Sequence, residues 1–250
     1  MKTKPRPNRC TLDACLRAAE TNLSGESWVE LPHCACPVIA GLVQRLAYSA
    51  DAPLRAAVKV YAARLPGTRT SCRVEQRRGW LAADWIVRTH TPAWLDLANM
   101  AHRAEALRTL PKICSPGAAQ AANARLLDIY AGAEALLDVA QRAAREVLGP
   151  GLISQVGVDV NKAVDVVRGA SDGVPPEEAL STARGAARNA AMVTALNTAA
   201  LRAARKVSRK QVLHAAVRRL APTRGMLQTS ALELLDRMIA LTDDALGGTP

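Results

Sequence analysis

Three side chains that can bind a metal or react as thiols lie within four positions of one another: His33, Cys34 and Cys36, directly before Pro37. Proline is favoured in the first turn of a helix, so we expect a helix to begin at Pro37, with Cys36 at or beside its N-cap. The helix dipole and the free N–H groups there lower the pKa of a thiol, because they stabilise the thiolate. One hypothesis for this motif is therefore a thiol-based redox or nucleophilic function.

A second hypothesis for the same motif is a zinc site. Structural Zn²⁺ takes four Cys or His ligands in tetrahedral geometry. Candidate ligands within the first 36 residues are Cys10, Cys15, His33, Cys34 and Cys36. Their spacing is not the paired Cys-x-x-Cys of zinc fingers and ribbons. The simpler interpretation is that small residues fix a turn before the helix, and we expect no bound cofactor.

An aromatic cluster with one carboxylate is the next candidate site. Its members lie within fifteen residues of one another: Trp80, Asp84, Trp85 and Trp94. They could line a ligand pocket, with His90 and His102 as nearby acid–base groups. Alternatively, the indoles anchor a helical hairpin in a core that contains no Phe, and Asp84 forms an ordinary helix ion pair with Arg88, four positions later. Because no partner motif accompanies the cluster, we predict no catalytic residue.

Basic residues are concentrated in two segments of this chain of net charge +11. Residues 1–9 carry four Lys or Arg, and residues 179–232 carry ten without a single acidic residue. Cations at three- and four-residue steps share one helix face, as contact with a phosphate backbone requires. The residues that we expect to bind an anionic partner are Arg184, Arg188, Arg202, Arg205, Lys206, Arg209, Lys210, Arg218 and Arg219.

The partner classes that fit this basic tract are nucleic acid and acidic protein. The tract has no helix-turn-helix pattern, and the chain has few aromatic residues for stacking on bases. It also lacks the Trp or Phe anchors of a membrane-surface helix. The segment "LGPGL" at 148–152 lacks the Lys and Ser/Thr of a phosphate-binding loop. We therefore predict a binding or scaffold protein rather than an enzyme. A solvated basic surface without a partner is the plainer alternative.

The elements that position these residues are expected to be helices. Alanine is abundant, only 3% of residues are aromatic and Phe is absent, which favours an all-α multi-helix bundle. We predict that Thr91 and Pro92 start a new helix, that Ser208 and Gln211 form a capping box, and that Pro222 ends the helix begun there. A last helix is predicted after Pro222, through 246. For the valine-rich segment 152–169, a strand is the alternative to a helix. The other helices are predicted at 11–21, 37–48, 51–65, 72–90, 118–148, 152–169 and 177–206.

The organisation that we predict has three parts. Residues 1–9 form a basic flexible tail, residues 10–115 an N-terminal helical domain, and residues 116–250 an alanine-rich helical region; the boundary lies at "SPG". No apolar stretch reaches the ~18 residues of a membrane span, and no signal peptide is evident. We therefore expect a cytoplasmic protein with reduced thiols.

Three motifs in the first half carry a family resemblance: "CACPVIA" (34–40), "RRGWLAADWIVRTHTPAWLDLA" (77–98) and "HRAEALRTLPKI" (102–113). In this order and spacing they resemble a group of uncharacterised, alanine-rich bacterial proteins. That group has a Cys-x-Cys-Pro-Val motif, an Ala-Asp-Trp-x-Val-Arg helix, a Thr-Pro turn and a helix that ends in Leu-Pro-x-Ile. The resemblance covers residues 28–113. It implies a common domain but no reaction, because no activity is known for the group.

Overall fold

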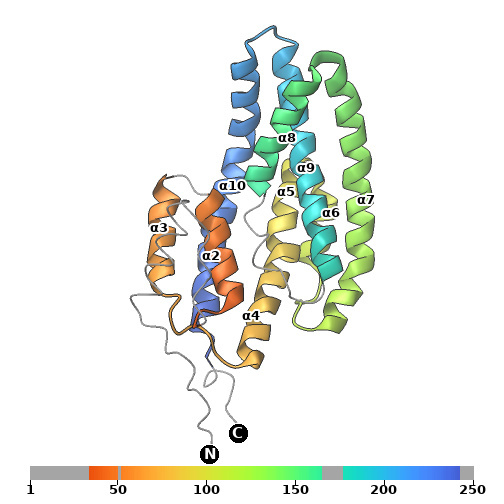
Figure 1. The fold of residues 1–250 in the computed structure, drawn as a ribbon. Coiled ribbons are helices and arrows are strands. Elements are labelled where there is room, and N and C mark those ends of the chain that lie inside the picture. Colours follow the sequence, from red (N-terminus) through yellow and green to blue (C-terminus); the bar gives the residue numbers. More distant parts are fainter. Residues whose placement is uncertain (1–33, 50–51, 165–176, 243–250) are drawn as a thin grey trace, which may run out of the picture.

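The computed structural model describes residues 34–49, 52–164 and 177–242, and the elements in these ranges are helices without any strand (Figure 1). The all-α class is therefore confirmed, and residues 150–164 are helical. The predicted basic tail and the predicted helix at 11–21 lie outside the described residues. In chain order the helices are α2 (Pro37–Ser49), α3 (Ala52–Ala63), α4 (Cys72–Trp85), η1 (Ile86–His90), α5 (Thr91–Leu97), α6 (Ala101–Arg108), α7 (Pro116–Val147), α8 (Pro150–Val164), α9 (Glu177–Ala203) and α10 (Arg209–Ala240).

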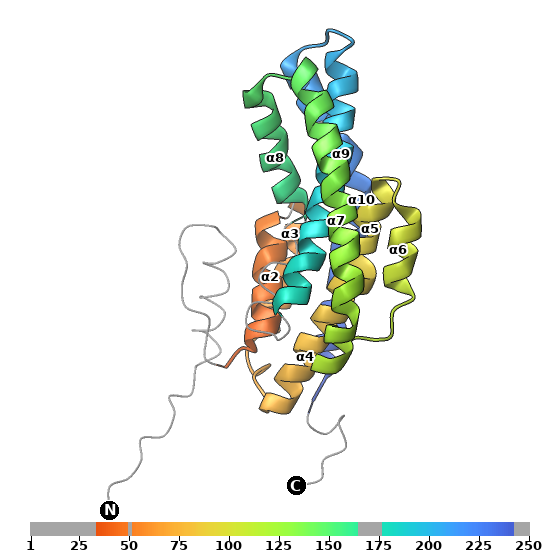
Figure 2. The same ribbon diagram turned by 90° about the vertical axis from the view of Figure 1, so that its right-hand side faces the viewer.

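Helix α9 is the centre of the bundle. It packs against α5, α7, α8 and α10, as the two perpendicular views show (Figures 1 and 2). Residues 189–196 are all buried, so this stretch has no solvent-facing side. Small residues allow the close approach that such a position needs: a Cβ at Gly185 would lie 2.7 Å from Tyr130 Cε2 of α7. The high alanine content thus follows from helix–helix packing.

Helix α5 begins at Thr91 with Pro92 in its first turn, as predicted, but the predicted break before it is wrong, because α4 continues through η1 into α5 without a non-helical turn. Residues 86–90 form a π-helical turn in which the Thr91 N–H donates to the Ile86 carbonyl oxygen. This wider turn shifts the hydrogen-bond register ahead of the proline, which has no N–H to donate. The Thr91 hydroxyl caps nothing, since it donates to the Ala183 carbonyl oxygen of α9 at 3.1 Å.

The predicted end of a helix at Pro222 is also wrong. Helix α10 runs without interruption from Arg209 to Ala240, with Pro222 inside it. Its N-terminal half packs on α8 and α9, and its C-terminal half packs on α2, α3 and α4 (Figure 1). An interior proline disfavours a helix by about 3 kcal/mol. Burial of apolar side chains on both sides of Pro222, among them Leu220 and Leu227, offsets this cost.

Buried Arg78 closes the C-terminal end of α10. Its side chain is 1% exposed, and its guanidinium donates to carbonyl oxygens of Met238 (Nε, 2.8 Å), Leu241 (Nη2, 2.8 Å) and Thr68. The last carbonyls of a helix have no intrahelical partner and carry partial negative charge, so a cation there is favourable. Arg78 therefore joins α4 to α10.

Helices from both sides of the predicted domain boundary share one hydrophobic core. Helix α5 packs on α9, and α10 packs on α2 and α4. Ser115 is the N-cap of α7, which starts at Pro116, so the break read from "SPG" is a helix start. The division into two domains at 115 stays a prediction. Within the described residues, no helix is both long and apolar enough to cross a membrane.

Candidate functional site

The antiparallel pair α9–α10 brings part of the basic tract together. The turn between the helices closes on Lys206, whose φ is +54° and whose N–H donates to the Ala203 carbonyl oxygen at 2.8 Å. Helix α10 then begins with the predicted capping box. Ser208 Oγ accepts from the Gln211 N–H, and Gln211 Oε1 accepts from the Ser208 N–H at 3.0 Å. This box is confirmed, and it fixes where the side chains of the first turns of α10 lie.

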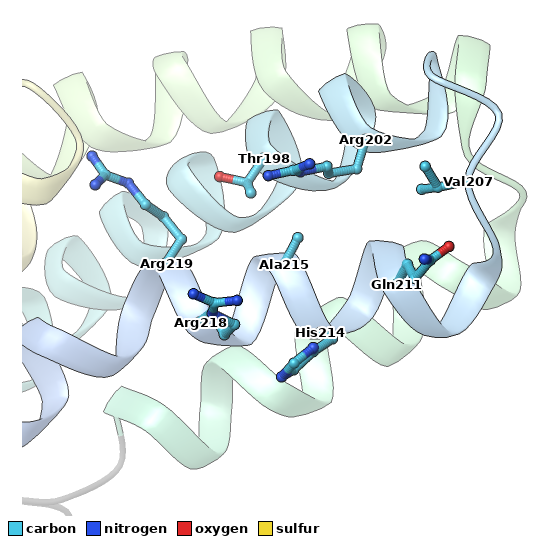
Figure 3. Close-up of a pocket in the computed structure, with 8 residues that line it drawn as sticks. All are labelled: Thr198, Arg202, Val207, Gln211, His214, Ala215, Arg218 and Arg219. Carbon is cyan, nitrogen blue, oxygen red and sulfur yellow. The ribbon is translucent and has the colours of Figure 1, made fainter.

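A pocket of about 430 Å³ lies between the two helices near this turn. Thr198 and Arg202 lie on α9, Val207 lies in the turn, and the other lining residues lie on α10 (Figure 3). Its lining residues are Thr198, Arg202, Val207, Gln211, His214, Ala215, Arg218 and Arg219. The pocket therefore brings together three arginines that the sequence separates by up to seventeen positions.

The charge of this pocket is positive and uncompensated by the rest of the described chain. Arg202, Arg218 and Arg219 are exposed, and none of them forms an ion pair with a carboxylate of residues 34–49, 52–164 or 177–242. Gln211 turns its oxygen to the capping box, so its amide NH₂ remains to donate. The Thr198 hydroxyl donates to the Thr194 carbonyl oxygen at 2.8 Å and is left as an acceptor. The arrangement offers guanidinium and amide donors to an anion.

The other predicted binding residues divide into two groups. Arg205, Lys206, Arg209 and Lys210 are exposed around the turn next to the pocket. Arg184 and Arg188 lie earlier on α9, at least fourteen residues before Arg202, or about 21 Å along a helix axis. Arg188 Nε donates to Asn161 Oδ1 of α8 at 2.8 Å. The structure thus groups most of the tract at one end of the α9–α10 pair and sets these two arginines apart.

The Cys motif forms the N-terminus of α2, as predicted. The Cys36 carbonyl oxygen accepts from the Ala40 N–H at 3.0 Å, and its own N–H donates to Thr68 Oγ1 at 2.9 Å. The Cys36 side chain is 0% exposed, in the hydrophobic core, and Cys34 is half-buried. The Cys34 carbonyl oxygen accepts from the Arg69 N–H at 3.0 Å. These contacts give the motif a structural role in joining α2 to the turn at 65–70.

Of the residues in the metal and redox hypotheses, the structure describes Cys34 and Cys36. Cys10, Cys15 and His33 lie outside the described residues. Among the residues that are described, no three His, Cys, Asp or Glu side chains are grouped so as to hold a metal ion. The zinc and thiol functions stay predictions.

The predicted aromatic cluster contributes to the core. Trp80, Trp85 and Trp94 are 6%, 3% and 0% exposed, and Trp85 Nε1 donates to Ser230 Oγ of α10 at 2.9 Å. Asp84 Oδ1 accepts from the Ile113 N–H at 2.8 Å and from Arg88 Nη1 at 3.3 Å, which is the predicted i, i+4 pair. These contacts fit the anchoring interpretation, because each polar group serves to join two elements.

His90 is a fully buried titratable residue between two of these indoles. Its Nε2 lies 3.2 Å from both the Val164 carbonyl oxygen and Trp94 Nε1, and its Nδ1 has no hydrogen-bond partner within the part of the chain that the structure describes. With the proton on Nε2, the ring donates to Val164; with the proton on Nδ1, Nε2 accepts from Trp94. Desolvation lowers the pKa of His90 to about 4, and the nearby charge of Arg184 adds to this effect. His90 is therefore neutral at physiological pH, and its role here is packing.

Sequence reasoning missed the uncharged members of the pocket. Gln211, His214 and Arg218 lie at i, i+3 and i+7, so they form one stripe on α10. That spacing was visible in the sequence. That Thr198 and the predicted Arg202 lie opposite this stripe follows only from the pairing of α9 with α10.

Comparison of the chain with protein-family models, with curated proteins and with solved structures finds no match. The family resemblance of residues 28–113 therefore stays a prediction. The functional proposal rests on the geometry and charge of the α9–α10 end.

Proposed function

We propose that this protein is a non-enzymatic binding or scaffold protein that docks an anionic macromolecule, nucleic acid or acidic protein, on the α9–α10 end. The observation that carries the proposal is the convergence of Arg202, Arg218 and Arg219 on one pocket without a carboxylate partner among the described residues. Uncompensated cations repel one another, which destabilises the compact state. A polyanion that binds there removes this repulsion.

The surrounding charges support an extended rather than a point-like partner. Four further cations follow around the turn: Arg205, Lys206, Arg209 and Lys210. Gln211 and Arg219 lie eight positions apart, or about 12 Å along α10. One DNA strand presents one phosphate per about 3.4 Å of helix axis, so this length faces three to four phosphates.

The thiol hypothesis gains less support. The Cys36 thiol is in the core, and a redox or nucleophilic function needs an accessible thiolate. Cytoplasmic location remains part of the proposal, and the free thiols Cys36, Cys72 and Cys114 are consistent with a reducing compartment.

Binding to labelled duplex DNA of random sequence and to poly-glutamate, measured by fluorescence anisotropy at rising salt, tests the proposal. We expect the full chain to bind at least one of them, with affinity that falls as salt rises. The variant R202A/R218A/R219A should lose most of this affinity. Its control is R73A/R77A/R125A, which removes three exposed arginines far from the turn, two of them on α4 at the opposite end of the molecule (Figure 1). Equal affinity of the two triple variants would refute the proposed site.

A further inference from the structure

The residues that line the pocket also indicate the chemistry of its ligand. We infer that it is a phosphate-binding site and that the anionic partner is accordingly a phosphodiester chain rather than an acidic protein; this inference rests on the proposed function and names the partner class.

The first argument is the number of charges in one recess. Three guanidinium groups line a pocket of about 430 Å³. One Asp or Glu side chain brings one negative charge, so an acidic protein would have to place several separate carboxylates in the same space, against their mutual repulsion. Each phosphodiester group also carries one charge, but one strand presents its phosphates at a regular spacing of about 3.4 Å along the helix axis, so neighbouring groups of a single ligand can contact more than one of these arginines.

The second argument is the type of cation. All three charged lining residues are arginine, although Lys206 and Lys210 lie close by in the sequence. The planar guanidinium presents a fork of donors that binds two oxygens of one phosphate, whereas lysine acts as a point charge. Arg202 reaches the pocket from α9, and Arg218 and Arg219 reach it from α10 (Figure 3). Donors from two sides fit a tetrahedral group better than a planar carboxylate.

The third argument is the neutral lining. The free amide NH₂ of Gln211 adds an uncharged donor whose orientation is fixed by the capping box with Ser208. Apart from the imidazole of His214, no ring lines the pocket, so it offers no platform on which a base could stack. The site would therefore bind phosphate groups without reading a base sequence.

A comparison of inorganic pyrophosphate with citrate tests whether the pocket recognises phosphate groups or only negative charge. Both are small polyanions, and each is added to the full chain at one ionic strength adjusted with NaCl. We expect pyrophosphate at a hundred times its Kd to raise Tm by about 5 °C, while citrate at the same concentration has little effect. R202A/R218A/R219A should lose the shift. R202K/R218K/R219K should keep only part of it, because it keeps the charges and loses the forks.

The result that would overturn the inference is an equal shift with citrate, no shift with pyrophosphate, or a full shift in R202A/R218A/R219A. Circular dichroism of each variant checks the fold. The shift in Tm of R202K/R218K/R219K is a second measurement, made on a chain of unchanged charge. DNA binding measured in parallel separates the two proposals. If DNA binds through the arginines but pyrophosphate does not, only the phosphate site fails. If pyrophosphate binds there but no macromolecule does, the phosphate site stands and the docking function fails.

Discussion

Arg78 Nε donates a hydrogen bond to the Met238 carbonyl oxygen at 2.8 Å and so joins helices whose residues are 160 positions apart in the chain. The same guanidinium holds the Leu241 and Thr68 carbonyl oxygens. Among residues 34–49, 52–164 and 177–242, no carboxylate forms an ion pair with Arg78; the C-terminal end of α10 supplies negative potential there.

Removal of this guanidinium should strongly destabilise the fold. R78A leaves three carbonyl groups without their donor, at a cost of about 3–5 kcal/mol in the free energy of unfolding. R78K should lie between R78A and the wild type, since one ammonium cannot reproduce the geometry of three donors. Urea denaturation measures both. The neighbouring exposed residue gives the control: R77A should change stability by less than about 0.5 kcal/mol. Similar values for R78A and R77A would contradict the capping role.

Stability should fall on acidification because of His90. Its pKa is about 4 in the folded chain and about 6.5 when unfolded, so between these values the unfolded chain binds more protons. The contribution is complete above pH 6.5 and is lost as the pH falls toward 4, by at most about 3 kcal/mol. Denaturation from pH 7 to 4 measures this slope. H90Q should flatten it, whereas H102Q, at an exposed position, should not. An unchanged slope in H90Q would refute the assignment.

Gly225 tests whether α10 is continuous beyond Pro222. It lies inside the helix, and a Cβ there would have nothing within 4 Å. G225A should therefore stabilise the protein by about 1 kcal/mol, because alanine has the better helix propensity. Thermal or urea denaturation measures the gain. A loss of stability would indicate that residue 225 does not lie inside a continuous helix.

Lys206 allows stability and binding to be separated. Its φ of +54° is a left-handed conformation that glycine adopts without the side-chain penalty. K206G should raise stability by about 1 kcal/mol yet weaken DNA binding, because one cation beside the pocket is lost. K210A removes a neighbouring charge without the backbone effect, so it should weaken binding without the stability gain. If K206G binds DNA as tightly as the wild type, the turn is not part of the interface.

Local signals in the sequence predicted local structure well. The Ser208–Gln211 capping box and the start of α2 at Pro37 are confirmed, because each depends on residues within one helical turn. The rule that proline ends a helix failed at Pro222, and the turn predicted at Thr91–Pro92 is replaced by continuous helix. In both places long-range packing and, at Pro92, a π-helical turn outweigh the local preference, and neither can be read from a window of neighbouring residues.

The candidate site was predicted only in part. A tract without acidic residues revealed the charge, but Arg184 and Arg202 belong to the same sequence pattern and lie far apart on α9. Which cations converge depends on how α9 and α10 pair, a tertiary property. Arg78 was not predicted as an important residue, because nothing in the sequence distinguishes it from the other arginines. Its capping role follows only from its burial against the C-terminal end of α10.

The salt dependence of DNA binding tests the central claim most directly. Each phosphate contact that is lost reduces the magnitude of the slope of log Kobs against log[salt] by about 0.9. R202A/R218A/R219A should therefore have a slope shallower than that of the wild type by about 2.7, while R73A/R77A/R125A should keep the wild-type slope. If both triple variants have the same slope, the arginines of the α9–α10 pocket do not contact the phosphate backbone, and the account of this site is wrong.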